Sequence, residues 1–404
     1  MRIGPWLVLA LTTFPSALDG QVAGTEAEDQ TGWEFTGLPA VNYDSDEGFG
    51  YGAILSIYNY GAGGFSPYRF TLRPLIYFTT EGRRDLTVFF DGPKLLPGGW
   101  RLTAFAGLEK HIATPYYGIG NDTPFVPENA EGDNPYYYRF GREKVVLRGT
   151  LQRHIGDLPL RFLLGAQLSH FDIDPIPKGE GTTLLAEELD LWAGEIMPIE
   201  DPGGAQNTLR AGLIWDTRDR ETGPRSGTWT SALMERADEV LGSAYTFTRW
   251  TLTDRRYFTL RDGLVLANRL VFQETTGDPP FYALSYVQSS FAAGEGLGGA
   301  GSLRGVLRNR YIGQGLFFWN AEVRWRFREV RFFGKPGHLA AIGFLDSGRV
   351  WAKGLELPGL FSDLHHGGGG GLRVGLGPNF VLAFDLARGS EAGTQTYIGL
   401  GYLF

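Results

Sequence analysis

The chain has 404 residues, with no cysteine, 59 glycines, 14% aromatic residues and a formal net charge of -8. This acidic balance, with arginine scattered rather than massed, argues against a nucleic-acid partner, and the absence of cysteine excludes disulfides and thiolate zinc sites. The surplus of glycine and aromatic residues favours one large closed β-structure over two or three soluble domains.

The N-terminus has the three-part order of a secretory signal peptide. Arg2 precedes the apolar run Trp6–Leu11, and small residues follow around Ala17 and Ala23. We therefore expect a signal peptide over residues 1–23, with the cleavage site left open between the two alanines; a buried N-terminal helix is the alternative. No later stretch reaches the roughly 18 uninterrupted apolar residues of a transmembrane helix. A membrane location would therefore require a barrel.

After a short N-terminal segment, residues 24–32, strand-like stretches and turn signals alternate to the end of the chain. The expected strands are residues 33–43, 48–59, 67–79, 84–91, 100–111, 137–154, 160–173, 206–216, 227–237, 244–260, 264–274, 315–328, 338–348, 367–377, 380–389 and 394–404. The fold class is therefore expected to be all-β, a transmembrane β-barrel of about 16 antiparallel strands over residues 33–404, with a long loop folded into it.

The lengths of the connections support a barrel. The long ones are residues 112–136, 174–205, 275–314 and 349–366, and all four are expected on one rim. Short ones, such as residues 261–263 and 377–379, are expected on the other rim. Long loops outside and tight turns at the periplasmic rim are typical of outer-membrane barrels.

Residues Phe318–Phe327 alternate strictly between apolar and polar side chains. The apolar positions are Trp319, Ala321, Val323, Trp325 and Phe327, and the polar ones are Asn320, Glu322, Arg324 and Arg326. The same period of two appears in Gly371–Leu376 and Phe380–Leu386. Such a period predicts strands with one face in lipid and the other in a polar lumen. A soluble sandwich would also alternate, so this pattern alone leaves both structures open.

The last expected strand, residues 394–404, carries a further signal. Ile398, Leu400, Tyr402 and Phe404 share one face of it. A chain that ends on an aromatic residue in an amphipathic strand resembles the terminal signal of bacterial outer-membrane proteins. We therefore expect Tyr402 and Phe404 at the membrane interface, where barrels carry aromatic girdles.

The glycine-rich connection Gly294–Gly315 contains the motif Leu303-Arg304-Gly305-Val306. Glu322 follows on the next expected strand, and Phe344-Leu345-Asp346-Ser347-Gly348 follows on the one after. In this order, the residues resemble the Val-Arg-Gly-Phe loop, the glutamate strand and the Phe-x-Asp-x-Gly strand of the BamA-like outer-membrane assembly and secretion barrels, also called the bacterial surface antigen family.

Two upstream segments extend the resemblance over nearly the whole mature chain. Residues 215–219 and 224–227 are similar to the family's Asp-x-Arg-Asp turn and the Pro-Thr-Arg-Gly that follows it. Residues 38–44 and 48–52 are similar to its first hairpin. Each motif alone is weak, and their order and spacing carry the assignment.

The resemblance implies that Arg304 enters the lumen and pairs with Glu322 and Asp346, within the motif that Gly348 completes. Both carboxylates have the predicted lumen parity, so a guanidinium could bridge them with charge-assisted hydrogen bonds. Removing one partner of such a buried pair costs about 3 to 5 kcal/mol. We interpret the arginine as a latch that holds the loop as a plug. A solvated loop arginine beside two unrelated carboxylates is the alternative.

The chain departs from the family pattern in two respects. Val306 replaces the usual aromatic residue, so looser packing of the loop tip is expected. Family members also usually carry periplasmic POTRA domains that receive client proteins, and residues 24–32 leave no room for them. A separate periplasmic partner is therefore the expected source of that role.

The seam between the first and last strands is the second candidate site. Gly37 and Pro39 lie on the first strand, and Gly399 and Gly401 on the last. Proline cannot donate to a ladder, and glycine adds no packing. Such a seam could open sideways into the bilayer, the family's proposed route for inserting clients; an ordinary irregular strand start is the alternative.

These observations predict a bacterial outer-membrane barrel that inserts proteins or translocates lipid or protein. Its expected partners are outer-membrane lipids, client proteins and a periplasmic partner. We expect no cofactor, no metal site and no enzyme, since His365-His366 lacks a third ligand and no nucleophile motif is present. The alternatives are a passive pore or structural barrel and, less favoured, a lipid hydrolase.

Overall fold

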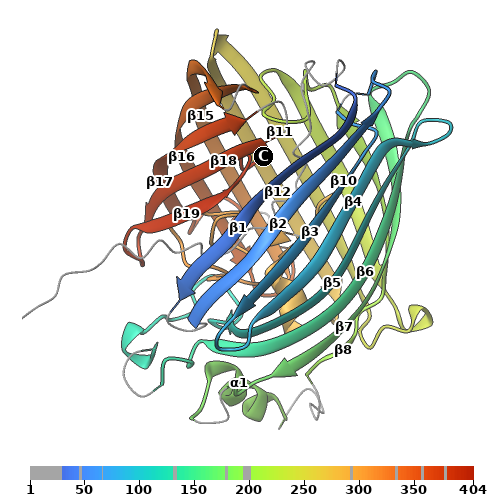
Figure 1. Ribbon diagram of the computed structural model, residues 1–404. Helices are drawn as coiled ribbons and strands as arrows, with labels where there is room; N and C mark the ends of the chain where they lie inside the picture. The colour runs from blue at the N-terminus through green and yellow to red at the C-terminus, as the bar shows by residue number, and fades with distance from the viewer. Residues whose placement is uncertain are drawn as a thin grey trace, which may run out of the picture.

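The computed structural model (Figure 1) describes residues 30–44, 48–65, 67–130, 134–177, 181–193, 202–291, 294–332, 335–355, 359–376 and 380–404. The predicted signal peptide, residues 1–23, lies outside the described residues. The first strand begins at Gly32.

The described part of the chain forms one antiparallel meander of sixteen main strands. In chain order they are β1 (Gly32–Asp44), β2 (Gly48–Gly61), β3 (Phe70–Thr79), β4 (Arg84–Leu96), β5 (Trp100–Pro115), β6 (Arg139–His154), β7 (Leu160–Asp174), β9 (Thr208–Asp216), β10 (Gly227–Ala237), β11 (Phe247–Arg261), β12 (Leu264–Gly277), β15 (Gly315–Phe332), β16 (Lys335–Trp351), β17 (His365–Leu376), β18 (Phe380–Gly389) and β19 (Gln395–Leu400). Each strand pairs with the next one in this order. The predicted barrel of about 16 strands is confirmed.

The connections between the main strands contain short helices and short strands. They are η2 (Pro127–Ala130), α1 (Leu184–Ala193), β8 (Gly204–Ala205), η3 (Glu239–Leu241), η4 (Phe281–Ser285), β13 (Tyr286–Val287) and β14 (Gly294–Glu295). Among the residues described, no helix is long and apolar enough to cross a membrane.

Alternation along the strands separates an apolar outer face from a polar inner face. On β15, Trp319, Val323 and Trp325 are exposed, whereas the intervening Asn320 and Glu322 are both fully buried. Successive side chains of a strand point to opposite faces, so this pattern follows directly from the sequence. The exposed apolar residues form the surface that a transmembrane barrel presents to lipid.

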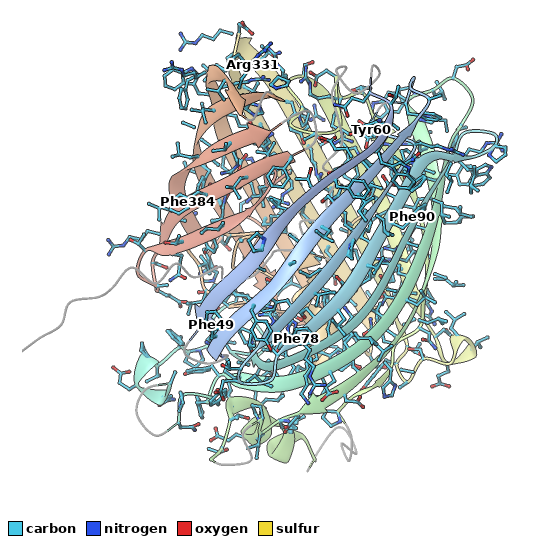
Figure 2. All side chains as sticks on the ribbon, viewed as in Figure 1. Phe49, Tyr60, Phe78, Phe90, Arg331 and Phe384 are labelled. Atoms are coloured by element: carbon cyan, nitrogen blue, oxygen red, sulfur yellow. The ribbon has the colours of Figure 1, made fainter. Side chains whose placement is uncertain are left out.

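Aromatic side chains gather at both ends of β1 to β4. Phe49 and Phe78 lie near one end (Figure 2). The centroid of the Tyr51 ring is 6.4 Å from that of Phe49 and 6.1 Å from that of Phe78. Near the other end, the Phe70 ring lies 6.0 Å from Phe90 and 5.6 Å from Trp33. Two such groups correspond to the aromatic girdles at the two interfaces of a membrane barrel.

The meander places the long connections on one rim. β5, β7, β12 and β16 all end at this rim, and α1 lies there (Figure 1). We assign this rim to the cell exterior, because long loops face outward in such barrels. The opposite, periplasmic rim carries the turns after β9, β11 and β15, and Arg331 lies at its edge (Figure 2).

The prediction for the last strand is wrong beyond Leu400, where β19 ends. Gly401 adopts a left-handed conformation with φ of 87°, and its N–H donates to the carbonyl of Val381. Tyr402 and Leu403 leave the sheet, and Phe404 lies buried inside the barrel, 6% exposed. A single left-handed glycine therefore turns the predicted interface aromatic into the lumen.

Candidate functional site in the barrel lumen

The connection between β12 and β15 folds into the lumen. Its residues Leu297, Leu303 and Val306 are buried in one cluster with side chains of the wall, including Val271, Leu316, Phe318 and Val350. Val306 is 6% exposed, so it contributes to this packing although it is smaller than an aromatic residue. Apolar contacts thus hold the loop against β12, β15 and β16, and they bring Arg304 to the polar wall.

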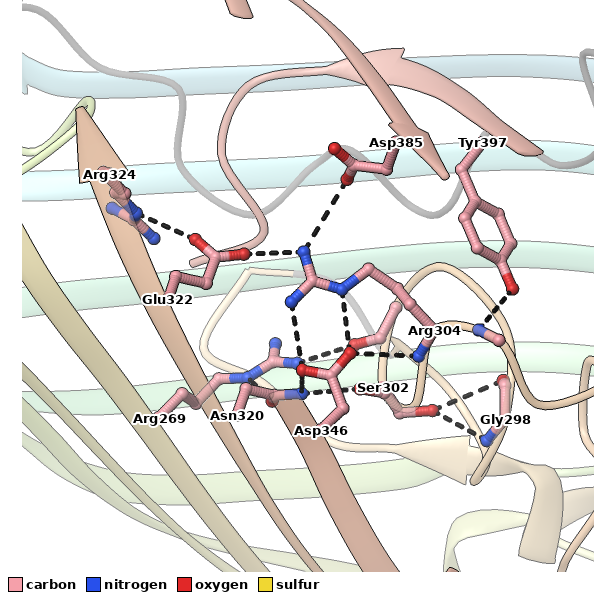
Figure 3. A network of polar contacts seen from close by, with 12 residues as sticks. Arg269, Gly298, Ser302, Arg304, Asn320, Glu322, Arg324, Asp346, Asp385 and Tyr397 are labelled. Atoms are coloured by element: carbon pink, nitrogen blue, oxygen red, sulfur yellow. Dashed lines mark hydrogen bonds and ion pairs between the residues drawn. The ribbon is translucent and has the colours of Figure 1, made fainter. Parts of the chain in front are cut away.

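Arg304 binds two carboxylates on adjacent strands (Figure 3). Its Nε and Nη2 donate to the two oxygens of Asp346, at 2.8 and 3.0 Å, and its Nη1 donates to Glu322 Oε1 at 2.7 Å. The Arg304 backbone N–H also donates to Asp346, at 3.1 Å. These side chains are at most 1% exposed. The guanidinium therefore makes the bidentate, charge-assisted contacts that fix one loop geometry.

The buried guanidinium remains charged. Burial would lower the pKa of Arg304, but the neighbouring Asp346 and Glu322 carboxylates outweigh it and hold the pKa above its ordinary value. The guanidinium also lies over the Phe344 ring, 3.5 Å from its centroid, which adds a cation–π contact.

Further residues extend the network beyond those named from the sequence. Asp385 lies 3.6 Å from Arg304 Nη1 and accepts two hydrogen bonds from Arg373, at 2.6 and 3.0 Å. Arg324 Nε donates to the second oxygen of Glu322 at 2.8 Å. Arg304, Arg324 and Arg373 thus face Glu322, Asp346 and Asp385.

Asn320 joins the loop backbone to the same network. It donates to the Ser302 carbonyl at 2.6 Å and to Asp346 at 2.8 Å, and it accepts from Arg269 at 2.9 Å. Arg269 in turn donates to the Gly301 carbonyl at 2.8 Å. Asn320 and Arg269 are therefore site residues that the sequence did not indicate, although strand alternation puts both inside.

Glycines in the wall let the motif backbone come close. A Cβ on Gly367 would lie 1.9 Å from the Arg304 carbonyl oxygen, and one on Gly389 would lie 2.6 Å from the Gly305 carbonyl oxygen. Gly305 itself has φ of 90°, which favours glycine. Gly348 is predicted to lie beside the latch. A Cβ at this position would instead lie 2.7 Å from Phe318 Cβ and 3.0 Å from Leu297 Cδ1, so glycine is needed for these two side chains to pack there.

The last strand also contacts the motif. The Tyr397 hydroxyl of β19 accepts from the Gly305 N–H at 3.0 Å (Figure 3). A Tyr397→Phe variant leaves this N–H without its acceptor, and we expect it to lower the free energy of unfolding by about 1 to 3 kcal/mol.

The temperature at which the folded band converts to the unfolded band on a denaturing gel measures this effect. Tyr51→Phe is the matched control, because Tyr51 is half exposed on the outer face. Equal conversion temperatures for the two variants would show that the contact does not stabilise the loop.

The structure brings the seam residues to two sheet edges. Pro39 is opposite Ala53 of β2, and Gly399 is opposite Ala383 of β18. Within the described residues, no ladder joins β1 to β19, and no atom lies within 4 Å of a Cβ added to Gly399.

The end of the chain reaches the same network from the periplasmic side. The Phe404 carbonyl accepts from Arg324 Nη2 at 2.7 Å, and its ring lies below the guanidiniums of Arg324 and Arg269, at 4.9 and 5.2 Å. Through Arg324 and Glu322, the last residue is therefore connected to Arg304 by three consecutive hydrogen bonds.

The described residues contain no cluster of three metal-ligating side chains. The imidazole of His365 stacks on the Tyr311 ring, with centroids 3.6 Å apart. His366 points to the opposite face of β17, where it contacts Ser347 of β16. Adjacent strand residues point apart, so the two imidazoles do not form a shared site.

A family model described as the Omp85 superfamily domain matches residues 111–402. The chain therefore belongs to the Omp85 superfamily, and the resemblance predicted from the motifs is confirmed. No curated protein matches the sequence.

Among solved structures, the chain is similar to BamA from Haemophilus ducreyi lacking POTRA domains 1-3, with a TM-score of 0.55, 15% identity, and coverage of 95% of this chain and 74% of that one. It is also similar to CdiB from Escherichia coli, with a TM-score of 0.54, 12% identity, and coverage of 93% and 66%. At these identities the similarity shows the fold. Membership of the Omp85 superfamily, together with this fold, makes the protein a bacterial outer-membrane β-barrel.

Proposed function

We propose that this barrel inserts proteins into the outer membrane, or translocates protein or lipid across it, with the loop carrying Arg304 as its plug. The observation that carries the proposal is the position of that loop. It occupies the lumen, and it is hydrogen-bonded both to the wall, through Asp346, and to the last strand, through Tyr397. Because the plug is hydrogen-bonded to the edge strand β19, displacement of the plug from the lumen is coupled to separation of the strands at the seam.

The seam is the proposed route to the bilayer. Pro39 lacks the N–H that a ladder with the last strand would use at that position, and Gly399 presents no side chain for β1 to pack on. Few interactions would then have to break when the edges separate. Outer-membrane lipids and client proteins are the proposed ligands, with a periplasmic protein as the proposed partner; no catalytic role is proposed.

Cross-linking the seam tests this function. The chain has no cysteine, so cysteines introduced at Thr36 and Gly399 are the only thiols. We expect closure by a reducible bismaleimide or disulfide to make cells that need the protein sensitive to large antibiotics, because a closed seam blocks lateral release. Reductant should restore growth in the presence of these antibiotics.

Two controls make the result specific. The single variants Thr36→Cys and Gly399→Cys carry the same substitutions without closing the seam, and both should support growth. Normal growth and an intact envelope with the seam fully cross-linked would instead favour a passive pore or a structural barrel.

A further inference from the structure

The periplasmic mouth of the barrel contains a strongly basic cavity. It has a volume of about 610 Å³, which is within the range of small-molecule sites. Five arginines line it, Arg220, Arg225, Arg324, Arg326 and Arg328, against two carboxylates, Asp262 and Glu329. This charge contrasts with the chain as a whole, which has a net charge of -8. We propose that the cavity binds a phosphate group.

The turn between β9 and β10 forms one wall of the cavity and is held rigidly. Asp219 Oδ1 accepts from the backbone N–H groups of Arg225 and Ser226, at 2.8 and 3.2 Å. Glu221 reaches across the mouth to Arg101 of β5, at 3.0 Å. These contacts fix the backbone that carries Arg220 and Arg225.

The other wall is the periplasmic end of β15, which carries Arg324, Arg326 and Arg328. Arg331, further along the same strand, lies at the rim (Figure 2). Arg328 is exposed and makes no ion pair within the described part of the chain.

Arg324 has one buried donor that a ligand in the cavity could use. Its side chain is 5% exposed, and two of its nitrogens are used by Glu322 and by the Phe404 carbonyl. The third, Nη1, is buried and has no hydrogen-bond partner among the described residues. A ligand oxygen in the cavity would provide an acceptor for this N–H.

The remaining cations are free to turn toward a ligand. Arg225 pairs with Asp262, which is 99% exposed, and Arg326 pairs with Glu329, which is 68% exposed. Exposed pairs of this kind contribute little stability, so a multivalent anion can replace these carboxylates. A phosphate offers three or more acceptors to guanidinium forks, a better match than a single carboxylate.

Two sources could supply this phosphate, a phospholipid headgroup or a soluble phosphate. Apolar side chains of Val265, Val381 and Tyr402 share the lining, so the cavity also accommodates carbon atoms next to the anion. The inference does not depend on the proposed transport function, since binding is measured on the purified barrel and the seam experiment is measured in cells.

The test measures binding of phosphatidylglycerol to the full chain in detergent by native mass spectrometry. The cavity variant is Arg326→Gln with Arg328→Gln. Its matched control is Arg153→Gln with Arg256→Gln, two exposed arginines outside the cavity that remove the same charge. We expect the cavity variant to bind about tenfold more weakly than the control variant. Resistance of the folded band to heat verifies that both variants fold.

Two probes identify the chemistry. Competition by excess inorganic phosphate would show that the phosphate group alone is recognised, and saturable lipid binding without competition would identify the headgroup as the ligand. Both results support the proposal. Equal binding by the two double variants, absence of saturable binding, or equally tight binding of oleate, an anion without phosphorus, would overturn it.

Discussion

Replacement of Arg304 by alanine is expected to release the β12–β15 connection from the lumen wall. The substitution removes two of the four hydrogen bonds that Asp346 accepts and leaves this carboxylate buried at 0% exposure. Breaking a buried pair in this way costs about 3 to 5 kcal/mol. We expect a lower unfolding temperature. If the loop is the plug that we propose, the single-channel conductance in a planar bilayer is also expected to rise.

Two comparisons isolate the contribution of the latch. Arg304→Lys keeps the charge but loses the planar fork, so its conductance should lie between those of Arg304→Ala and the unaltered barrel. Arg256→Ala removes an exposed pair with Asp254 and should change neither property. A conductance of Arg304→Ala equal to that of Arg256→Ala would show that this arginine does not hold the plug.

A Gly367→Ala variant should displace the same loop without changing any charge. The added methyl group would lie 1.9 Å from the Arg304 carbonyl oxygen, so the motif backbone has to move away from β17. Overpacking of this kind costs about 1 to 3 kcal/mol. We therefore expect raised conductance and a lower unfolding temperature, as for Arg304→Ala.

Gly343→Ala is the matched control, since no atom lies within 4 Å of the added methyl group on the neighbouring strand. Because both substitutions act on one loop position, combining Gly367→Ala with Arg304→Ala should produce much less than the sum of their effects. Additive losses of stability would mean that the glycine supports the strand rather than the loop.

Strand parity accounts for most of what could be predicted. Alternation around Glu322 fixes its face, because a shift of one residue would place every apolar side chain of β15 in the lumen. The same reasoning put Asp346, Arg373 and Asp385 inside. The contacts of Glu322, Asp346 and Asp385 with the Arg304 guanidinium depend on the register of β15 to β18, and this register is not contained in any local pattern.

The path of the loop and the last turn were harder to predict. Arg304 could be assigned to the lumen only from the order of the motifs, since an arginine among glycines is by itself compatible with water. The alternation that ends in Tyr402 and Phe404 continues past Gly401, and nothing local shows that this glycine is left-handed. Cations inside the barrel stabilise the turned end, and these come from β12 and β15, far away in the sequence.

The direction of the Arg304 contacts has a consequence for the order of folding. Its carboxylate partners Glu322, Asp346 and Asp385 lie 18, 42 and 81 residues toward the C-terminus. Tyr397, which accepts the hydrogen bond from the Gly305 N–H, lies 92 residues after Gly305. Arg304 is therefore synthesised before its three carboxylate partners, and contacts between distant residues form slowly. Since the Arg304 loop makes its last contact with the last strand, through Tyr397, the lumen network becomes complete only when the whole sheet has formed. A barrel that stops folding before β19 is added therefore keeps a loosely held loop.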